Sequence, residues 1–166
     1  MLRCLHGMRV DVVAQERYWY PDDGGEVWVA GFQVVDAEGR YLGRDAPELV
    51  DAGLRVSRVA GARDHHADAL QAEGAAPGSA LVLRRERENE HDANAIAVET
   101  SEGDVLGFVP RDLAAEIAPR IDEGEAYSAL VLREQRATPR DPRTGLTMLL
   151  APVAELHLRV LPVPRD

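Results

Sequence analysis

The stretch that decides the fold is RERENEHDANAI, residues 85–96. It is a run of polar residues between two apolar segments, residues 79–85 and 95–99, which is typical of a loop that joins two β-strands. Asparagine and aspartate at positions 89, 92 and 94 bond readily to their own backbone, so we expect them to fix the shape of the loop. From spacing alone, a rigid connection between strands is favoured over a binding site.

The residues after this loop predict a hairpin and then a helix. A Ser-Glu-Gly-Asp turn separates strands expected at 95–99 and 105–109. Pro110 and Gly124 suit the start and the end of a helix over residues 111–121. Pro119 lies inside it and predicts a kink or a junction between two short helices. The apolar residues that recur at helical spacing are Leu113, Ala114, Ile117 and Ile121.

Further strands are expected on both sides of this region, at residues 54–60, 126–134, 146–150 and 155–160. Many short strands with one main helix predict a mainly β fold, a small OB-like or SH3-like barrel of about six strands with one or two short helices. Alternation along the strands and the helix face predicts a set of core residues. They are Leu81, Leu83, Ile96, Val98, Val105, Val109, Leu113, Ile117, Leu130 and Leu132.

Residues 1–53 are predicted to form an N-terminal extension. Segments 8–20 and 26–35 are rich in β-branched and aromatic residues and flank a Pro-Asp-Asp-Gly-Gly turn, so they predict a β-hairpin. Residues 43–53 are expected to be a connector. The chain is thus divided into an extension (1–53), a barrel domain (54–160) and a tail (161–166). The aromatic residues of the hairpin are expected to pack against the barrel: Tyr18, Trp19, Tyr20, Trp28 and Phe32.

The charge of the chain argues against an extended basic surface. The net charge is −10, and all 19 cationic residues are arginine. Residues 54–135 contain 9 arginines and 16 acidic residues. Proteins that bind nucleic acids are usually basic, because their affinity comes from neutralising phosphates. Any nucleic-acid site here is therefore expected to be a local pocket, with weak long-range steering.

The sequence contains no motif that predicts catalysis. Without lysine it cannot form a Walker-type ATP site, and GxSxG, HExxH and CxxC motifs are absent. His65 and His66 lack the spacing of metal ligands, and Cys4 with His6 cannot hold a structural zinc ion alone. We therefore expect no catalytic residue, no metal and no cofactor.

No segment of the sequence predicts membrane insertion or secretion. A run of about 18 apolar residues, as a transmembrane helix requires, does not occur. The first ten residues place Arg3, His6 and Arg9 among apolar residues and lack the apolar core of a signal peptide. With Cys4 as the only cysteine, no internal disulfide is possible. The sequence predicts a cytoplasmic protein that makes no membrane contact.

Several spaced motifs resemble the HIRAN domain family. The family pattern is R-E-P-x-N-x-x-D-x-N-A-I, then an apolar strand, a glycine-containing hairpin that ends in proline, and an alanine-rich helix. Residues 103–110 resemble the hairpin, residues 113–124 the helix, and residues 59–63 the first strand and its glycine turn. The resemblance covers about half of the chain. The residues that match the pattern in register are Arg85, Glu86, Asn89, Asp92, Asn94, Ala95 and Ile96.

The resemblance implies an OB-like barrel that grips the 3′-hydroxyl end of single-stranded DNA. Relatives in translocases of the helicase-like transcription factor type remodel stalled forks, which implies a role in DNA repair and a helicase or nuclease partner on another chain. By position, Asp92 would accept a hydrogen bond from the 3′-OH, and His91 would stack on a base. Arg63 and Arg111 would contact phosphates. The other implied DNA-binding residues are His65, Arg85, Asn89 and Phe108.

The chain departs from the family pattern in three ways. Arg87 and Glu90 stand where the family has prolines. Glu88 and Glu90 place negative charge beside the implied DNA pocket, and residues 64–66 replace an aromatic pair. These departures leave open an acidic protein-interaction module that keeps the barrel but not DNA binding. A hydrolytic or metal-dependent enzyme is the third alternative.

Overall fold

The structure, a computed structural model, describes residues 7–22 and 25–162. Within these residues the strands are β1 (Met8–Asp22), β2 (Gly25–Val34), β3 (Arg55–Arg58), β4 (Ala80–Arg85), β5 (Ile96–Thr100), β6 (Val105–Phe108), β7 (Ser128–Arg136), β8 (Arg143–Ala151) and β9 (Leu156–Leu161). The helices are α1 (Pro47–Asp51), α2 (Ala62–His65), the 3₁₀ turns η2 (Ala69–Gln71) and η3 (Glu73–Ala75), and α3 (Arg111–Asp122). The predicted mainly β fold is confirmed.

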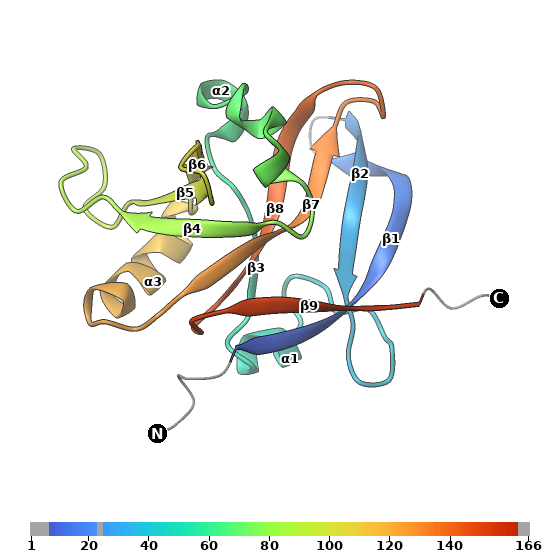
Figure 1. Ribbon diagram of the computed structural model, residues 1–166, viewed down its shortest axis with the longest axis horizontal. Helices are drawn as coiled ribbons and strands as arrows, with labels where there is room; N and C mark the ends of the chain where they lie inside the picture. Colours follow the sequence, from blue (N-terminus) through green and yellow to red (C-terminus); the bar gives the residue numbers. More distant parts are fainter. Residues whose placement is uncertain (1–6, 23–24, 163–166) are drawn as a thin grey trace.

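All nine strands found in the described residues belong to one sheet, with the order β6-β5-β4-β7-β2-β1-β9; in addition, β8 pairs with β7, and β3 pairs with β8. Figure 1 shows β4, β5, β6 and α3 on one side of the molecule and the β1–β2 hairpin on the other. β7 and β8 run between the two sides. The hairpin predicted for the extension therefore continues the same sheet as the barrel strands.

β7 is the strand that joins the two halves of the sheet. It pairs with β8 along its length, with β4 through Ala129 and Leu130, and with β2 through residues 133–136. Side chains on both of its faces are buried, because each face covers a different core. Ala129 and Val131 belong to the core under α3, whereas Leu130 and Leu132 belong to the core under the hairpin.

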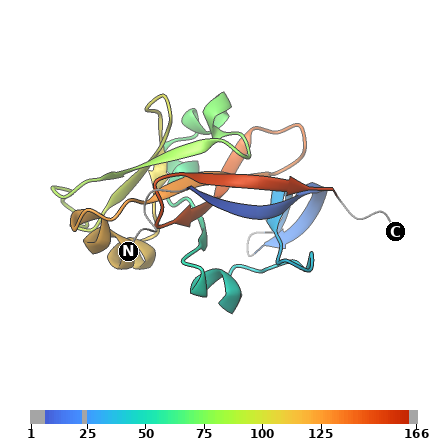
Figure 2. The ribbon, with the colours of Figure 1, turned by 60° about the horizontal axis from the view of Figure 1, so that its bottom comes forward.

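The two hydrophobic cores explain why the hairpin is held firmly. The first core fills the space between β4–β6, β8 and α3. The second lies between β1, β2, α1 and the strands β7–β9, and includes Val12 and Leu149, both fully buried. Figure 2 shows β9 lying along β1, with α1 below the two strands in this view.

The aromatic residues of the hairpin differ in burial. Trp28 is buried, and the guanidinium carbons of Arg17 and Arg136 lie 5.5 and 6.0 Å from the centre of its ring. Phe32 is partly buried against the second core. Packing is therefore confirmed for these two rings. The packing prediction is wrong for Trp19, which is 50% exposed. The side chains of Tyr18 and Tyr20 lie outside the described part of the structure.

α3 is continuous through Pro119, so the expectation of two short helices is wrong. Pro110 precedes the first helical residue, as predicted. Gly124 ends the helix with φ +95, which suits glycine, and its N–H donates to the carbonyl of Ile121. The N–H of Glu125 donates to the carbonyl of Arg120, which completes a Schellman motif. Pro119 lacks the N–H that would donate to the carbonyl of Ala115, so the helix passes it with one backbone hydrogen bond fewer.

The core prediction is wrong at one position, Val105, which is only partly buried. The pairing of β5 with β6 shifts between Val98, opposite Gly107, and Glu99, opposite Val105. This bulge turns Leu106 into the core, where it is fully buried. Leu83 and Leu113 pack against the core from partly exposed positions. The residues buried as predicted are Leu81, Ile96, Val98, Val109, Ile117, Leu130 and Leu132.

Two segments between strands, one of them the expected connector at residues 43–53, contain helical turns. Residues 62–75 form α2, η2 and η3, and bury Leu70 and Ala75 completely. Residues 43–53 contain α1, whose Leu49 is buried in the second core. Both segments are too short to show helical periodicity. No helix of the described part is long and apolar enough to cross a membrane. Cys4, His6 and residues 163–166 lie outside the described residues.

A buried carboxylate lies where β7 pairs with β8. The Glu134 side chain is 9% exposed and bonds to the guanidinium groups of Arg136 and Arg143. Arg143 also donates to the carbonyls of Leu70 and Ala72, so it ties η2 to the sheet. Burial raises the pKa of Glu134, but the two arginines outweigh it and hold the pKa below its ordinary value.

Candidate nucleic-acid interface

The loop between β4 and β5 is closed by its own backbone. The N–H of Glu86 donates to the carbonyl of Ala95, and the N–H of Ala95 donates to the carbonyl of Asp92. Asn89 organises the turn between them, because its Oδ1 accepts hydrogen bonds from the N–H groups of His91 and Asp92 at 2.9 and 3.1 Å. The predicted role in shaping this loop is confirmed for Asn89 and for Asp92, whose Oδ1 accepts a hydrogen bond from the N–H of Asn94.

Arg85 anchors the loop to the rest of the protein. Its side chain is 9% exposed and donates to the carbonyls of Ala93 and Ala95, at 3.0 and 2.8 Å. It also forms two hydrogen bonds of 3.0 Å with the carboxylate of Asp122. The bond from Arg85 and a second from Arg87, against the opposing effect of desolvation, hold the pKa of Asp122 below its ordinary value. These bonds occupy Arg85 with the protein, so its role in DNA contact stays a prediction.

Asp122 is a site residue that the sequence reasoning missed. It lies at the last turn of α3, 37 residues after Arg85, and carries no motif of its own. Its matching position opposite the loop appears only when the helix packs against β5. In the sequence alone, nothing distinguishes this aspartate from the acidic residues Glu123 and Glu125 that follow it.

Asp92 has its carboxylate at the surface of the loop. Oδ1 accepts a hydrogen bond of 2.9 Å from the N–H of Asn94. Oδ2 lies 3.8 Å from Nε of Arg111, the first residue of α3. The Asp92 side chain is 22% exposed and that of Arg111 is 74% exposed. Arg111 also reaches the carbonyl of His91 at 3.4 Å. The backbone of Asn94 therefore fixes Oδ1, whereas the carboxylate remains partly exposed beside Arg111.

Phe108 connects this loop with α2. Its strand β6 pairs with β5 through Ala97, and the backbone of Phe108 exchanges hydrogen bonds of 2.8 and 2.9 Å with Ala60. α2 follows Ala60 after one glycine and carries the exposed side chains of Arg63 and His65. The structure therefore brings His91, Asp92 and Arg111 together directly, and places Arg63 and His65 on the segment that borders Phe108.

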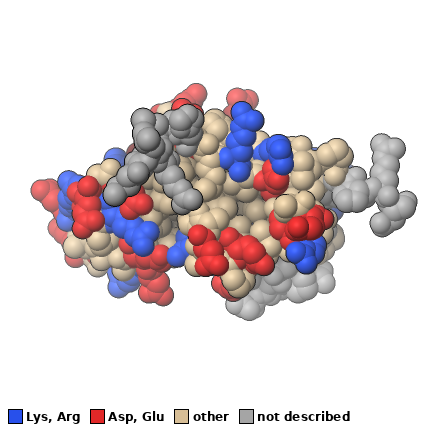
Figure 3. Space-filling view, turned by 90° about the horizontal axis from the view of Figure 1, so that it is seen from below, with Lys and Arg blue, Asp and Glu red and all other residues tan. Residues whose placement is uncertain are grey.

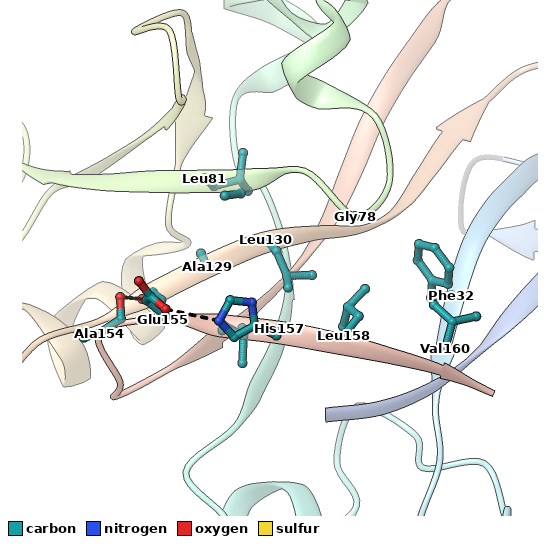
Figure 4. A pocket seen from close by; sticks show the side chains of 13 residues that line it. Phe32, Gly78, Leu81, Ala129, Leu130, Ala154, Glu155, His157, Leu158 and Val160 are labelled. Atoms are coloured by element: carbon teal, nitrogen blue, oxygen red, sulfur yellow. Dashed lines mark hydrogen bonds and ion pairs between the residues drawn. The ribbon is translucent and has the colours of Figure 1, made fainter. Parts of the chain in front are cut away.

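A partly apolar cavity lies away from these residues. It has a volume of about 590 Å³ and is bounded by β9, β7, the start of β4 and Phe32 of β2. Figure 4 shows Leu130, Leu158 and Val160 around it, with His157 bonded to Glu155 at one end. None of the predicted DNA-binding residues lines this cavity.

The surface charge is mixed. Figure 3 shows one face of the molecule, on which the described acidic and arginine side chains are interspersed. Among the residues that the structure describes, no group of three or more histidine, cysteine or acidic side chains could hold a metal ion. His65 and His66 instead lie edge to face, with ring centres 6.4 Å apart.

A small β-rich module with a rigid polar loop is the class of protein that this fold and site define. The HIRAN domain model matches residues 56–150, more than half of the sequence, and the chain belongs to the HIRAN domain family. Members of this family bind DNA, so the chain belongs with nucleic-acid-binding modules. No curated protein matched the sequence.

Two solved structures are similar to the chain. The HIRAN domain of human HLTF shares 21% identity, with a TM-score of 0.44 over 60% of this chain and 76% of that one. A protein from Lactobacillus plantarum shares 24% identity, with a TM-score of 0.42 over 58% of this chain and 91% of the other.

Proposed function

We propose that the chain is a non-enzymatic module that binds the 3′-OH end of single-stranded DNA at the loop between β4 and β5. The observation that carries this proposal is the Asp92 carboxylate, which is fixed by Asn94 and accessible beside Arg111. Membership of a DNA-binding family supports the class of ligand. A helicase or nuclease on another chain would supply any remodelling or cleavage of the DNA.

The carboxylate suits a terminal hydroxyl rather than a phosphate. An ionised aspartate only accepts hydrogen bonds, so a 3′-OH can donate to it directly. A 3′-phosphate would bring two negative groups together and be repelled. Arg111 lies close enough to Asp92 to hold the phosphate that precedes the terminal sugar while the hydroxyl reaches the carboxylate.

Side chains around Asp92 would hold the rest of the terminal nucleotides. His91 is exposed next to the carboxylate and would stack on a base. Phe108 is partly buried, and its ring would meet a neighbouring base. Arg63 on α2 would contact a phosphate, with His65 beside it. Arg85 and Asn89 would act through the loop, because their polar groups already bond to it.

Replacing Asp92 with alanine is expected to remove the preference for a 3′-OH. In the native protein, a charge-assisted hydrogen bond would favour 3′-OH strands over 3′-phosphate strands by about tenfold. The measurement is fluorescence anisotropy at low salt, with two single strands of one sequence that differ only at the 3′ end. Equal affinity of the native protein for the two strands would contradict the role of Asp92.

Three companion variants separate end recognition from general binding. Arg63→Ala and Arg111→Ala should each weaken the binding of both strands to the same extent. Each should also lower the slope of log affinity against log salt by about 0.7. His91→Ala should weaken binding by about 1–3 kcal/mol without changing the end preference. A selective loss of 3′-OH binding in Arg63→Ala would count against this assignment of roles.

A second candidate, an acidic protein-interaction module, is favoured by one observation. Trp19 is 50% exposed on the hairpin of a chain with a net charge of −10. An exposed tryptophan is a common anchor at protein interfaces. Failure of the native protein to bind any single strand at low ionic strength would favour this function over DNA binding.

A further inference from the structure

Two adjoining cavities form a groove across the sheet between β2 and α2. Their volumes are about 440 and 170 Å³, and they share Val27, Arg58 and Gln135. Figure 1 shows α2 and β2 on opposite sides of the region where β7 ends and β8 begins. The smaller cavity reaches Arg63 of α2, and the larger one reaches Arg44 in the connector after β2.

The groove is richer in cations than the chain as a whole. Four arginines and two aspartates line it, in a chain with a net charge of −10. Such a local excess of positive charge is the property that a phosphate-binding site needs on an acidic protein. The charged residues of the groove are Arg44, Arg58, Arg63, Arg133, Asp45 and Asp64.

The floor of the groove is polar and shaped around Arg58. Gly145 leaves room for its guanidinium, because a Cβ there would lie 2.5 Å from one of the terminal nitrogens of Arg58. Gln135 is 5% exposed and donates to Oγ1 of Thr147 at 2.8 Å. Oε1 of Gln135 accepts no hydrogen bond from any part of the chain that the structure describes. A buried acceptor of this kind is costly unless a donor reaches it, which points to a ligand with N–H groups as well as negative charge.

The groove depends on the extension as much as on the family domain. β2 and the connector contribute Val27, Val29, Gln33 and Arg44, all of which precede the family match at residues 56–150. The opposite wall comes from β3, β7, β8 and α2, within that match. A HIRAN domain without this hairpin would present only the wall formed by β3, β7, β8 and α2.

We propose that this groove binds the part of the single strand that lies 5′ of the terminal nucleotides. Its phosphates would contact the arginines, and a base edge would lie near Gln135. Nucleobases carry N–H donors, and phosphodiesters carry the negative charge that the lining favours. The inference rests on the proposed function, because Arg63 belongs both to the groove and to the proposed end site. The N-terminal hairpin thus lengthens the stretch of DNA that the module covers.

The test compares strand lengths in the native protein and in Arg44→Ala. Arg44 is exposed, lies outside the end site and pairs with no described residue, so its removal should not disturb folding. Anisotropy is measured with 3′-OH strands of about 4 and about 12 nucleotides, which span the site sizes of OB folds. The native protein should bind the longer strand more tightly. Arg44→Ala should lower the affinity for the longer strand about two- to fivefold and lower the salt slope of that affinity by about 0.7. It should leave the affinity for the short strand unchanged.

The matched control is Arg40→Ala. Arg40 is an exposed arginine four residues earlier, paired with Asp36 and absent from the groove, so its loss changes the net charge equally. It should leave the binding of both strands unchanged. If the two variants changed the binding of the longer strand equally, or if affinity did not increase with strand length, the proposal that the groove binds DNA would be overturned.

A circular single strand, which has no end, separates this inference from the proposed function. Binding of the circle that Arg44→Ala weakens, without any preference for a 3′-OH in linear strands, would support the groove and contradict the end site. A clear 3′-OH preference with no effect of length or of Arg44→Ala would support the end site and overturn the groove.

Discussion

Truncation of Ile96 to alanine is expected to lower the free energy of unfolding by about 2–5 kcal/mol. Ile96 is fully buried in the first core, at the point where the loop enters β5. Its carbonyl accepts a hydrogen bond from the N–H of Val109, so the surrounding backbone cannot easily collapse into the cavity. Urea denaturation of the two proteins measures the difference.

The control for this truncation is Val82→Ala. Val82 lies on the neighbouring strand β4 and is 47% exposed, so its shortening should change stability by at most about 0.5 kcal/mol. If Ile96→Ala were as mild as Val82→Ala, β5 would not be a central strand of the barrel.

Replacing Glu134 with alanine is expected to cost about 3 kcal/mol, at the lower end of the range for breaking a buried ion pair. The change would leave the guanidinium of Arg143, 12% exposed, without its carboxylate. Arg136 is 22% exposed and can turn toward water, which limits the loss. Glu116→Ala is the control, since Glu116 is 43% exposed in its pair with Arg55 and such surface pairs contribute at most about 1 kcal/mol.

The stability conferred by Glu134 is expected to depend on pH in one direction. The folded protein holds its pKa below the ordinary value of 4.5, so the ionised form favours folding. The stabilisation is complete above the unfolded pKa and is lost as the pH falls through the lower, folded pKa. The difference in unfolding free energy between the native protein and Glu134→Ala should therefore shrink below about pH 4. A difference that grew on acidification would contradict the low pKa.

The features that could be predicted from the sequence are those with local causes. The loop at residues 85–96 follows from asparagine and aspartate bonding to nearby N–H groups, as the contacts of Asn89 and Asp92 show. The helix near residue 111 follows from its apolar face. The family pattern located both, because it records residue types at fixed short spacings.

The features that could not be predicted depend on contacts between distant segments. Arg85 meets Asp122 only after α3 packs against the barrel, and nothing near either residue indicates the pair. The bulge that exchanges Val105 for Leu106 depends on how β5 and β6 align. The short helical turns around Leu70 hold too few residues for periodicity to appear, so their burial was unforeseen.

The parallel pairing of β1 with β9 has a consequence for how the chain folds. Val10 lies beside Leu158, so the first strand finds one of its neighbours almost at the far end of the sequence. Contacts of such high sequence separation form slowly, because a long loop must close before they stabilise anything. During synthesis, β1 leaves the ribosome with one edge open until β9 follows, and that edge is exposed to other chains. The hairpin with β2 shields only the other edge.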